Sequence, residues 1–426
     1  MKKATRSLSY VLLEKFLRII LLLPKTIRKI TSSRIEIIIS RFYEFLNCMY
    51  LSGYILTGYE KYSNEPLRLL YFGDGLTYNF LSNIFFSQKP DKKYIGKMFF
   101  WNAKKGLKKY KEDVDIFIIH TERFYSKYFQ KKSFIVVPEW VNMLLDSSRD
   151  LDEICSSFSR GAKKDIKKIE KQGFTYELTN DPDKLLFFYN KMFLPYISSK
   201  HSLEIPRSYY IYVRYLMERD SVLLVKHDGK YVSGGLVGTV KDVDVLESMG
   251  IIDGNVDYLS KGASTALYYF HILSAKERGI KQLNYGDTRT FVRDGRFQFK
   301  RKWGMHVTIS KFRFNIFCIN FLNYKKSVES FLSNNPFIFL DGELLSCFVL
   351  SADKKPLNTN DLHHLFKMYY TPGFSQLCIF SKNGFSEDVN DFCIDGFVCK
   401  KLHSTFIGRE FDIFVFTEKT CLEGVT

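Results

Sequence analysis

The sequence lacks any apolar run long enough to cross a membrane. Across 426 residues, no window approaches the roughly 18 uninterrupted apolar residues that a spanning helix needs. It also lacks C-x-x-C pairs and the H-E-x-x-H motif, although it contains eight cysteines and eight histidines. These absences exclude a polytopic membrane protein and a disulfide-dense miniprotein. They predict reduced, buried thiols and no protein-bound metal.

Positive charge and aromatic rings are abundant instead. Lys and Arg number 63 against 46 Asp and Glu, a net charge of +17, and aromatic residues make up 16%. From Asp341 to Thr426 there are 8 basic and 12 acidic residues, a balance of −4, so the first 340 residues carry +21. A basic surface implies an anionic partner such as nucleic acid, a phosphorylated cofactor or a lipid headgroup. We expect that partner on the first three quarters of the chain.

Two basic segments need a structural interpretation. Residues 1–50 carry ten Lys and Arg and predict amphipathic helices ending near Pro24 and spanning about 35–51. They would dock on the protein's own core, or attach peripherally to an anionic membrane face from the cytoplasmic side. Residues 88–111 hold nine lysines among aromatics. They favour a solvated helix with a docked aromatic face, with single-stranded nucleic acid binding as the alternative.

The order of elements between residues 174 and 314 is well defined by its hydrophobic patterns and turn signals. It predicts a strand, two helices, three antiparallel strands, a helix beginning at Lys261-Gly-Ala, a strand over 280–285, a polar loop over 286–295, a short helix and a closing strand. An antiparallel meander that becomes parallel through a crossover helix belongs to the α+β class with a mixed sheet flanked by helices. Residues after about 330 predict a separate small, mildly acidic α/β domain.

Several residue groups add to this order, and together they resemble the GNAT acyltransferase superfamily, most closely its Fem-type branch of peptidoglycan aminoacyltransferases. The resemblance spans about residues 135–315. The groups are the basic helix 160–173, Gly250, Lys261-Gly-Ala263, Ala275-x-x-x-Gly279, Asn284-Tyr-Gly286, Asp287-Thr-Arg289, Asp294-Gly295 and Lys300-x-x-Trp303-Gly304.

The resemblance implies four segments. They are a basic helical region (1–64), a degenerate first GNAT-like half of a tandem (65–150), the acyltransferase domain (151–325) and the small acidic domain (326–426).

It also implies an N-acyltransferase that uses acyl-CoA and an amine acceptor, in cell-wall or surface-glycan synthesis. The superfamily's acyl-CoA signature is [Q/R]-x-x-G-x-[G/A], and aligning it here puts Tyr258 first and Lys261 at the glycine position. That departure keeps two alternatives open. One is a Fem-type aminoacyltransferase that takes its acyl group from aminoacyl-tRNA and acts on a lipid-linked precursor. The other is an inactive GNAT fold that binds nucleic acid or membrane.

The donor site is expected at the helix that starts near Gly262. A helix start offers unpaired backbone N–H groups and a positive dipole end, which suit a pyrophosphate. Lys261, Gly262, Ala263 and Ser264 form this candidate site; a plain helix start is the alternative.

Glu247 and Asp287 are the candidate general bases. Strand alternation places Glu247 among Val243, Val245 and Met249, and an apolar setting makes a carboxylate a stronger base. A solvated edge-strand carboxylate is the alternative for Glu247. Asp287 is the rival base, in the polar loop that follows the strand over 280–285.

The candidate substrate-binding residues are mostly cations. Arg289 could bind a carboxylate or a phosphate bidentately. Asp294, Lys300, Arg160 and Lys164 complete the set, and a salt-bridged loop or a solvated charged face is the alternative for each.

Overall fold

The computed structural model describes residues 48–74, 77–130, 134–200, 213, 216–311, 313–389, 392–406 and 409–419. Nearly all of the predicted N-terminal amphipathic helices, and most of the second of the two helices predicted before the three antiparallel strands, lie outside these residues. The described chain divides into two compact units. Unit 1 holds residues 143–286 and 299–306, and unit 2 holds residues 48–142, 287–298 and those from 307 onward. The four sequence segments stay a prediction.

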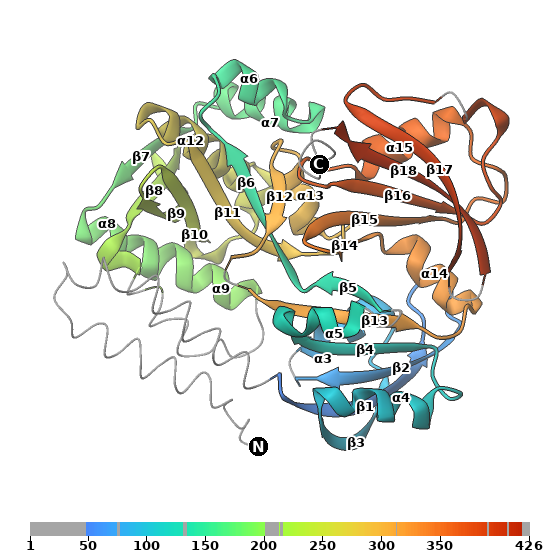
Figure 1. Ribbon diagram of the computed structural model, residues 1–426. Helices are drawn as coiled ribbons and strands as arrows, with labels where there is room; N and C mark the ends of the chain where they lie inside the picture. Colours follow the sequence, from blue (N-terminus) through green and yellow to red (C-terminus); the bar gives the residue numbers. More distant parts are fainter. Residues whose placement is uncertain are drawn as a thin grey trace. The chain divides into compact units, whose positions relative to one another are not determined.

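The strands of unit 1 belong to a seven-stranded mixed sheet in the order β12-β6-β11-β10-β9-β8-β7 (Figure 1). β7 through β10 pair antiparallel, and β10 pairs parallel with β11 after the crossover helix α12. The predicted α+β class with a mixed sheet flanked by helices is confirmed. The strands are β6 (Trp140–Asp146), β7 (Thr175–Thr179), β8 (Ser221–His227), β9 (Lys230–Val240), β10 (Val243–Ile251), β11 (Gln282–Arg289) and β12 (His306–Ile309).

The helices around this sheet bury apolar side chains. In α7, Ser159 Oγ accepts a hydrogen bond from Ala162 N at 3.1 Å and caps the helix, while Ala162, Ile166 and Ile169 are buried. Helix α12 is buried on most of its surface. The helices are α6 (Leu151–Ser156), α7 (Arg160–Lys171), α8 (Pro182–Phe187), the π-helical η3 (Phe188–Phe193), α9 (Leu194–Lys200), η4 (Ile252–Gly254), α11 (Asp257–Ser260), α12 (Ala263–Glu277) and α13 (Gly295–Arg301).

Gly250 is required by a close backbone approach between β10 and the π-helical turn η3. A Cβ added there would lie 2.5 Å from the carbonyl carbon of Met192 and 2.6 Å from Phe193 N. Only glycine lets the end of β10 pack directly on this turn.

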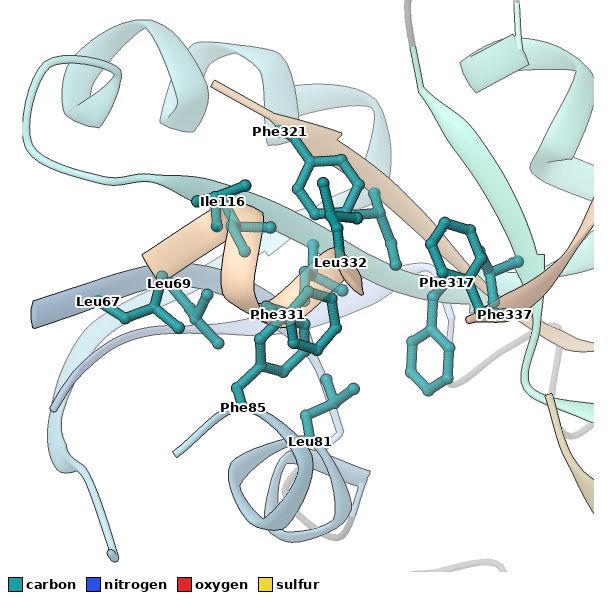
Figure 2. Packing of buried hydrophobic residues seen from close by; sticks show 14 of the residues in the cluster. Leu67, Leu69, Leu81, Phe85, Ile116, Phe317, Phe321, Phe331, Leu332 and Phe337 are labelled. Carbon is teal, nitrogen blue, oxygen red and sulfur yellow. The ribbon is translucent and has the colours of Figure 1, made fainter. Parts of the chain in front are cut away.

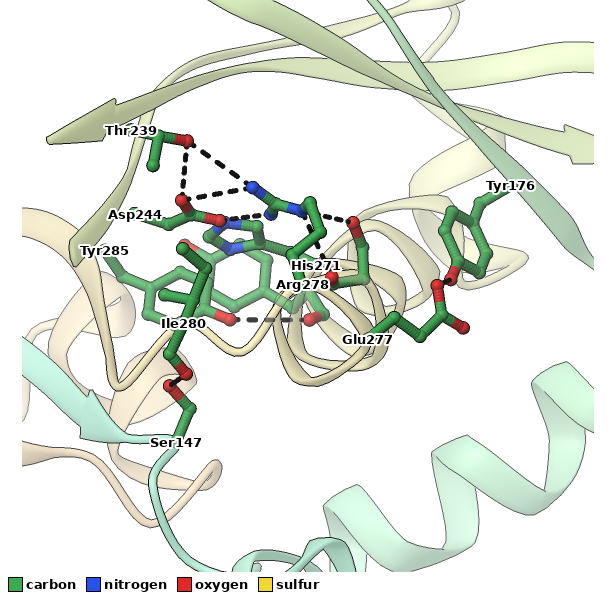
Figure 3. Close-up of polar contacts among 11 residues, drawn as sticks. Ser147, Tyr176, Thr239, Asp244, His271, Glu277, Arg278, Ile280 and Tyr285 are labelled. Carbon is green, nitrogen blue, oxygen red and sulfur yellow. Dashed lines mark hydrogen bonds and ion pairs between the residues drawn. The ribbon is translucent and has the colours of Figure 1, made fainter. Parts of the chain in front are cut away.

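A buried ionic network ties α12 to the first residues of β10 (Figure 3). Asp244 is fully buried, accepts a hydrogen bond from Thr239 Oγ1 at 2.8 Å and pairs with Arg278 near the end of α12. His271, also fully buried, lies 3.6 Å from Asp244, and burial lowers its pKa. The network fixes the crossover helix against the strand that precedes it.

Unit 2 contains two sheets. The six-stranded sheet has the order β3-β1-β2-β4-β13-β5, and the five-stranded sheet has the order β14-β15-β16-β18-β17. The strands are β1 (Tyr50–Tyr59), β2 (Pro66–Gly73), β3 (Asp91–Phe99), β4 (Ile116–Glu122), β5 (Ile135–Pro138), β13 (Asn315–Phe321), β14 (Phe337–Asp341), β15 (Leu344–Ser351), β16 (Gln376–Ser381), β17 (Phe397–Phe406) and β18 (Arg409–Glu418). The helices are α3 (Thr77–Phe85), η1 (Phe100–Asn102), α4 (Ala103–Tyr110), η2 (Arg123–Tyr125), α5 (Ser126–Gln130), α14 (Lys326–Asn334), α15 (Thr359–Tyr369) and η5 (Glu387–Val389).

One hydrophobic core joins these two sheets (Figure 2). Phe331 of α14 stacks on Phe85 of α3 with ring centroids 3.9 Å apart, and both are buried. Residues of the five-stranded sheet, including Phe337 and Phe348, belong to the same cluster as Leu69 and Ile116 of the six-stranded sheet. The acidic C-terminal segment therefore shares its core with the sheet that precedes it in sequence.

Two local predictions are wrong. Residues 88–111 are not one helix, because residues 91–99 form the edge strand β3 along β1, and only residues 103–110 are α-helical. The segment 286–295 is not all loop, because β11 continues to Arg289 beyond a left-handed Gly286 with a φ of 72°. In both places pairing with a distant strand outweighs the local pattern.

Candidate functional site

The parallel pairing between β10 and β11 ends early. It covers Val243 to Val245 on β10 and Gln282 to Asn284 on β11, although both strands continue beyond these residues. β10 stays paired with β9 up to Ile251, so only its other edge lacks a strand partner past Val245 in the described pairings. Such an edge presents backbone N–H and C=O groups that an extended ligand could bind.

The start of α12 follows the carboxyl end of β10, and its first turn is open. Gly262 is the N-cap with a φ of 96°, no side chain caps the helix, and the first turn holds no acidic residue. A Cβ added at Gly262 would meet nothing within 4 Å. Lys261 is exposed and Ser264 half-buried, whereas Ala263 is buried, with its carbonyl accepting a hydrogen bond from Ser233. The geometry fits an anion bound by backbone N–H groups.

A cavity of about 440 Å³ lies in the same unit, close to this helix start. Its lining includes Phe187, Tyr231, Ile252 and Tyr258. Lys261 Nζ lies 5.4 Å from the centroid of the Tyr258 ring, so the cavity and the α12 start share one neighbourhood. Gly229, Lys230, Asp253 and Asn255 complete the lining, so only the aromatic side of the cavity suits an apolar part of a ligand.

Glu247 occupies a bulge in β10. The register with β9 shifts between Leu246 and Ser248, so Glu247 is the extra residue, two positions past the last pair with β11. Its side chain is 19% exposed, and Oε1 lies 3.6 Å from Arg219 Nη2. The predicted apolar setting is therefore wrong, because a bulge breaks strand alternation and a guanidinium lies beside the carboxylate.

The other predicted cationic residues and Asp294 occupy different places. Arg160 and Lys164 are exposed on α7. Lys300 is buried, and its Nζ donates to the carbonyl of Gly286 at 2.9 Å. Asp294 Oδ1 accepts hydrogen bonds from the backbone N–H groups of Arg296 and Phe297 at the start of α13. Local contacts give Lys300 and Asp294 structural roles, and their binding roles stay predictions.

A second group of charged residues, in unit 2, was missed by the sequence reasoning. It lies where three strands of the six-stranded sheet end. β2, β4 and β5 run in the same direction, because β2 pairs parallel with β4 and β13 pairs antiparallel with both β4 and β5. Asp74 follows β2, His120 lies near the end of β4 and Glu139 follows β5. The sequence carries one titratable residue at or just past the end of each of these three strands, and that pattern is the signal that could have found them.

His120 is held between two carboxylates. Its Nδ1 lies 2.9 Å from Asp74 Oδ2 and its Nε2 lies 2.9 Å from Glu139 Oε2, with only 4% of the side chain exposed. Burial opposes its charge, but Glu139 and Asp74 together raise the pKa of His120 to about 10. In return His120 and Arg289 outweigh burial and lower the pKa of Glu139 to about 2, while the pKa of Asp74 also falls well below its usual value. His120 is therefore an imidazolium at neutral pH.

Arg289 extends this row of charges. Its Nη1 bonds Glu139 Oε1 at 2.5 Å, and its Cζ lies 3.8 Å from the Phe80 ring centroid and 3.7 Å from that of Trp140. Asp287, two residues earlier on β11, accepts a hydrogen bond from Asn142 Nδ2 at 3.1 Å and lies 3.9 Å from Arg313. The sequence predicted Arg289 and Asp287 as neighbours, but not the carboxylate and the aromatic rings that hold Arg289.

The described residues contain neither a cluster of metal ligands nor a membrane-spanning helix. No three His, Cys, Asp or Glu side chains there are arranged to hold a metal ion. Among the helices that the structure describes, none has the length and apolarity needed to span a bilayer.

Comparison with known proteins gives similarities in structure only. No family model matches the chain, and no curated protein matches its sequence. Among solved structures, FemX is similar at 14% identity and a TM-score of 0.34, over 62% of this chain and 83% of that one. The C-terminal domain of a putative lysylphosphatidylglycerol synthetase from Agrobacterium fabrum is similar at 10% identity and a TM-score of 0.32, over 68% of this chain and 92% of that one. A GCN5-related N-acetyltransferase from Sphaerobacter thermophilus is similar at 12% identity and a TM-score of 0.28, over 62% of this chain and 75% of that one. Because these TM-scores are below 0.5, we draw no function from them.

Proposed function

We propose that the chain is a GNAT-like N-acyltransferase that moves an acyl group from acyl-CoA to an amine. The observation that carries the proposal is the early end of the β10–β11 pairing, in the unit where α12 begins with an open, uncapped first turn. The unpaired edge of β10 suits the amide-bearing arm of coenzyme A, and the helix start suits its pyrophosphate.

In this proposal the residues at the α12 start bind the donor. The backbone N–H groups of Ala263 and Ser264 would bind the pyrophosphate, Gly262 would let it approach, and exposed Lys261 would add a positive charge. Coenzyme A supplies an activated thioester when it is bound. The cavity lined by Phe187 and Tyr258 would take an apolar part of a substrate.

Glu247 is the preferred general base. The amine nitrogen attacks the acyl carbon, the carbon–sulfur bond breaks, the thiolate leaves and takes up a proton, and the amine proton passes to the carboxylate. Glu247 lies on the strand whose free edge would bind the donor, and Arg219 at 3.6 Å orients it. Asp287 remains the rival base, held by Asn142.

The aminoacyl-tRNA alternative has one observation in its favour. Helix α7 presents six exposed basic residues, which would suit the phosphate backbone of RNA. They are Arg160, Lys163, Lys164, Lys167, Lys168 and Lys171. Neither the acceptor, whether a glycan amine or a lipid-linked precursor, nor attachment to an anionic membrane is tested by the described residues, and both stay predictions.

Calorimetric titration of the full chain with coenzyme A tests the donor. We expect Gly262→Glu to weaken binding at least tenfold, because it puts a carboxylate where the pyrophosphate would bind. Gly279→Glu is a matched control: it lies beyond the other end of α12 with a φ of 70° and open space around it. Equal binding by both variants, or no binding by the wild type together with steep salt-dependent tRNA binding, would reject acyl-CoA as the donor.

Turnover tests the base. With acetyl-CoA and a panel of amines, release of free thiol by Glu247→Gln should fall by about 10²–10⁴-fold, the usual contribution of a general base. Release of free thiol by Asp287→Asn should fall much less. Undiminished turnover in the double variant would remove both assignments.

A further inference from the structure

Arg289 is held by three neighbours in unit 2. Its Cζ lies 3.8 Å from the ring centroid of Phe80 and 3.7 Å from that of Trp140, and Glu139 accepts a hydrogen bond from Nη1. An arginine held in this way loses little further side-chain entropy when it binds a ligand.

The remaining edge of the guanidinium is available. Within the described part of the chain, the hydrogen bond from Nη1 to Glu139 is the one that the Arg289 side chain makes, which leaves the Nε and Nη2 donors for a ligand. These two N–H groups form a side-on fork whose spacing matches the two oxygens of a carboxylate. The Arg289 side chain is 19% exposed, so a ligand can reach these two donors from solvent.

Glu139 and His120 act as positioning residues for this fork. Glu139 is 7% exposed and bonds Arg289 through Oε1 and His120 through Oε2. Because Asp74 and the His120 imidazolium fix Glu139 in turn, the Arg289 guanidinium cannot rotate without breaking a buried charged row. Burying such a row of charges costs desolvation energy. An arginine that must be held in place to bind a ligand would explain why the chain keeps the row.

The charges around Arg289 favour a monoanion. Glu139 and Asp294 are the carboxylates whose charges act on Arg289, and the exposed Arg313 guanidinium, 5.7 Å from the Trp140 ring centroid, adds a positive charge. A phosphate dianion would meet more repulsion from these two carboxylates than a carboxylate would.

We propose that Arg289 anchors the carboxylate group of a small molecule or peptide at this edge of the six-stranded sheet. The inference rests on the proposed function only in that the carboxylate would belong to a substrate, the role that the sequence predicts for Arg289. It concerns binding alone, so its test needs no acyl donor, and its failure is distinguishable from a failure of acyl transfer.

The test is a titration of the full chain with N-acetylalanine, N-acetylalaninamide and inorganic phosphate, followed by calorimetry and by tryptophan fluorescence. We expect N-acetylalanine to bind at least tenfold more tightly than either its amide or phosphate. Trp140→Phe should remove most of the fluorescence change, because Trp140 stacks on the anchor.

Variants of the two arginines locate the site. Arg289→Lys keeps a positive charge but not the fork, and it should weaken carboxylate binding at least tenfold with an unchanged circular dichroism spectrum. Arg313→Gln is the matched control, because it removes an exposed guanidinium that lies 5.7 Å from the Trp140 ring centroid. Since solvent and salt screen that charge, this variant should weaken carboxylate binding no more than about threefold. The proposal is overturned if Arg289→Lys binds like the wild type, if the amide or phosphate binds as well as the carboxylate, or if no carboxylate binds.

Discussion

Replacing His120 with glutamine would test the buried row of charges that ends at Arg289. Glutamine can still donate a hydrogen bond to one carboxylate, but it removes the positive charge between Asp74 and Glu139. Removing one partner of a buried ion pair leaves an uncompensated charge and costs about 3–5 kcal/mol. We expect a loss of this size in the free energy of unfolding at pH 6.

The pH dependence separates charge from hydrogen bonding. His120 has a pKa of about 10 in the folded chain against 6.5 for an ordinary histidine, so the folded state binds its proton more tightly. A raised folded pKa contributes stability that is fully present below about pH 6.5 and is lost as the pH rises towards 10. Between pH 6 and pH 9.5, wild-type protein should lose about 3–4 kcal/mol from this group.

Urea unfolding at pH 6.0 and pH 9.5, followed by tryptophan fluorescence, measures both effects. The difference between wild type and His120→Gln should shrink by about 3–4 kcal/mol over this range, since only the wild type loses the imidazolium. His364→Gln, on the exposed face of α15, should change stability by less than about 0.5 kcal/mol at either pH. A constant difference between wild type and His120→Gln would refute the protonated His120 and the charged row built on it.

Two further predictions concern packing. Phe331→Ala should lower the free energy of unfolding by about 3–5 kcal/mol in urea, because it opens a cavity against Phe85 in a core that joins two sheets. Gly250→Ala should destabilise the chain by at least about 1–3 kcal/mol, since the new methyl group would lie 2.5 Å from the Met192 backbone. Gly161→Ala is its control: the nearest atom is 3.7 Å away and the residue is helical, so thermal unfolding should occur at an equal or higher temperature.

The elements that the sequence predicted well are those specified by local chemistry. Asp228 and Gly229 adopt φ values of 50° and 72°, as a tight hairpin turn requires, and they join β8 to β9 where the turn signal predicts. Ser159 caps α7, and the predicted apolar stripe of that helix is buried. In these cases the turn, the cap and the periodicity all lie within a few residues of the element that they define.

The failures came from long-range pairing. β3 is polar and lysine-rich, and it is a strand because β1 lies beside it, although the sequence predicts a helix over residues 88–111. At Gly286 one left-handed residue shifts the buried side of β11 from Leu283 and Tyr285 to Thr288 and Thr290. A glycine in a strand signals a local irregularity, but it does not say which face the following residues take.

In the candidate site, too, features set by local sequence could be predicted and features set by long-range pairing could not. The start of α12 could be predicted because a glycine before an apolar helix is a local signal, whereas the bulge at Glu247 depends on its register with β9. Asp74, His120 and Glu139 are separated by tens of residues, and only the shared direction of β2, β4 and β5 brings them together. Convergence at the carboxyl ends of parallel strands is a topological fact, so it follows from strand order and not from residue spacing.

Strand β11 supplies residues to both parts of the proposed activity. Its first residues pair with β10, whose unpaired edge is proposed to bind the donor, and its last residues include Arg289, which is proposed to bind a carboxylate. Gly286 separates the two halves, and its amide donates to Asn284 Oδ1 at 2.8 Å while its carbonyl accepts from Lys300. The hydrogen bond to this carbonyl offsets part of the cost of burying the Lys300 ammonium, and it holds the residue at which the strand changes its exposed face. Lys300, predicted from the sequence as a contact for substrate, thus also has a structural role at Gly286, and its binding role stays a prediction.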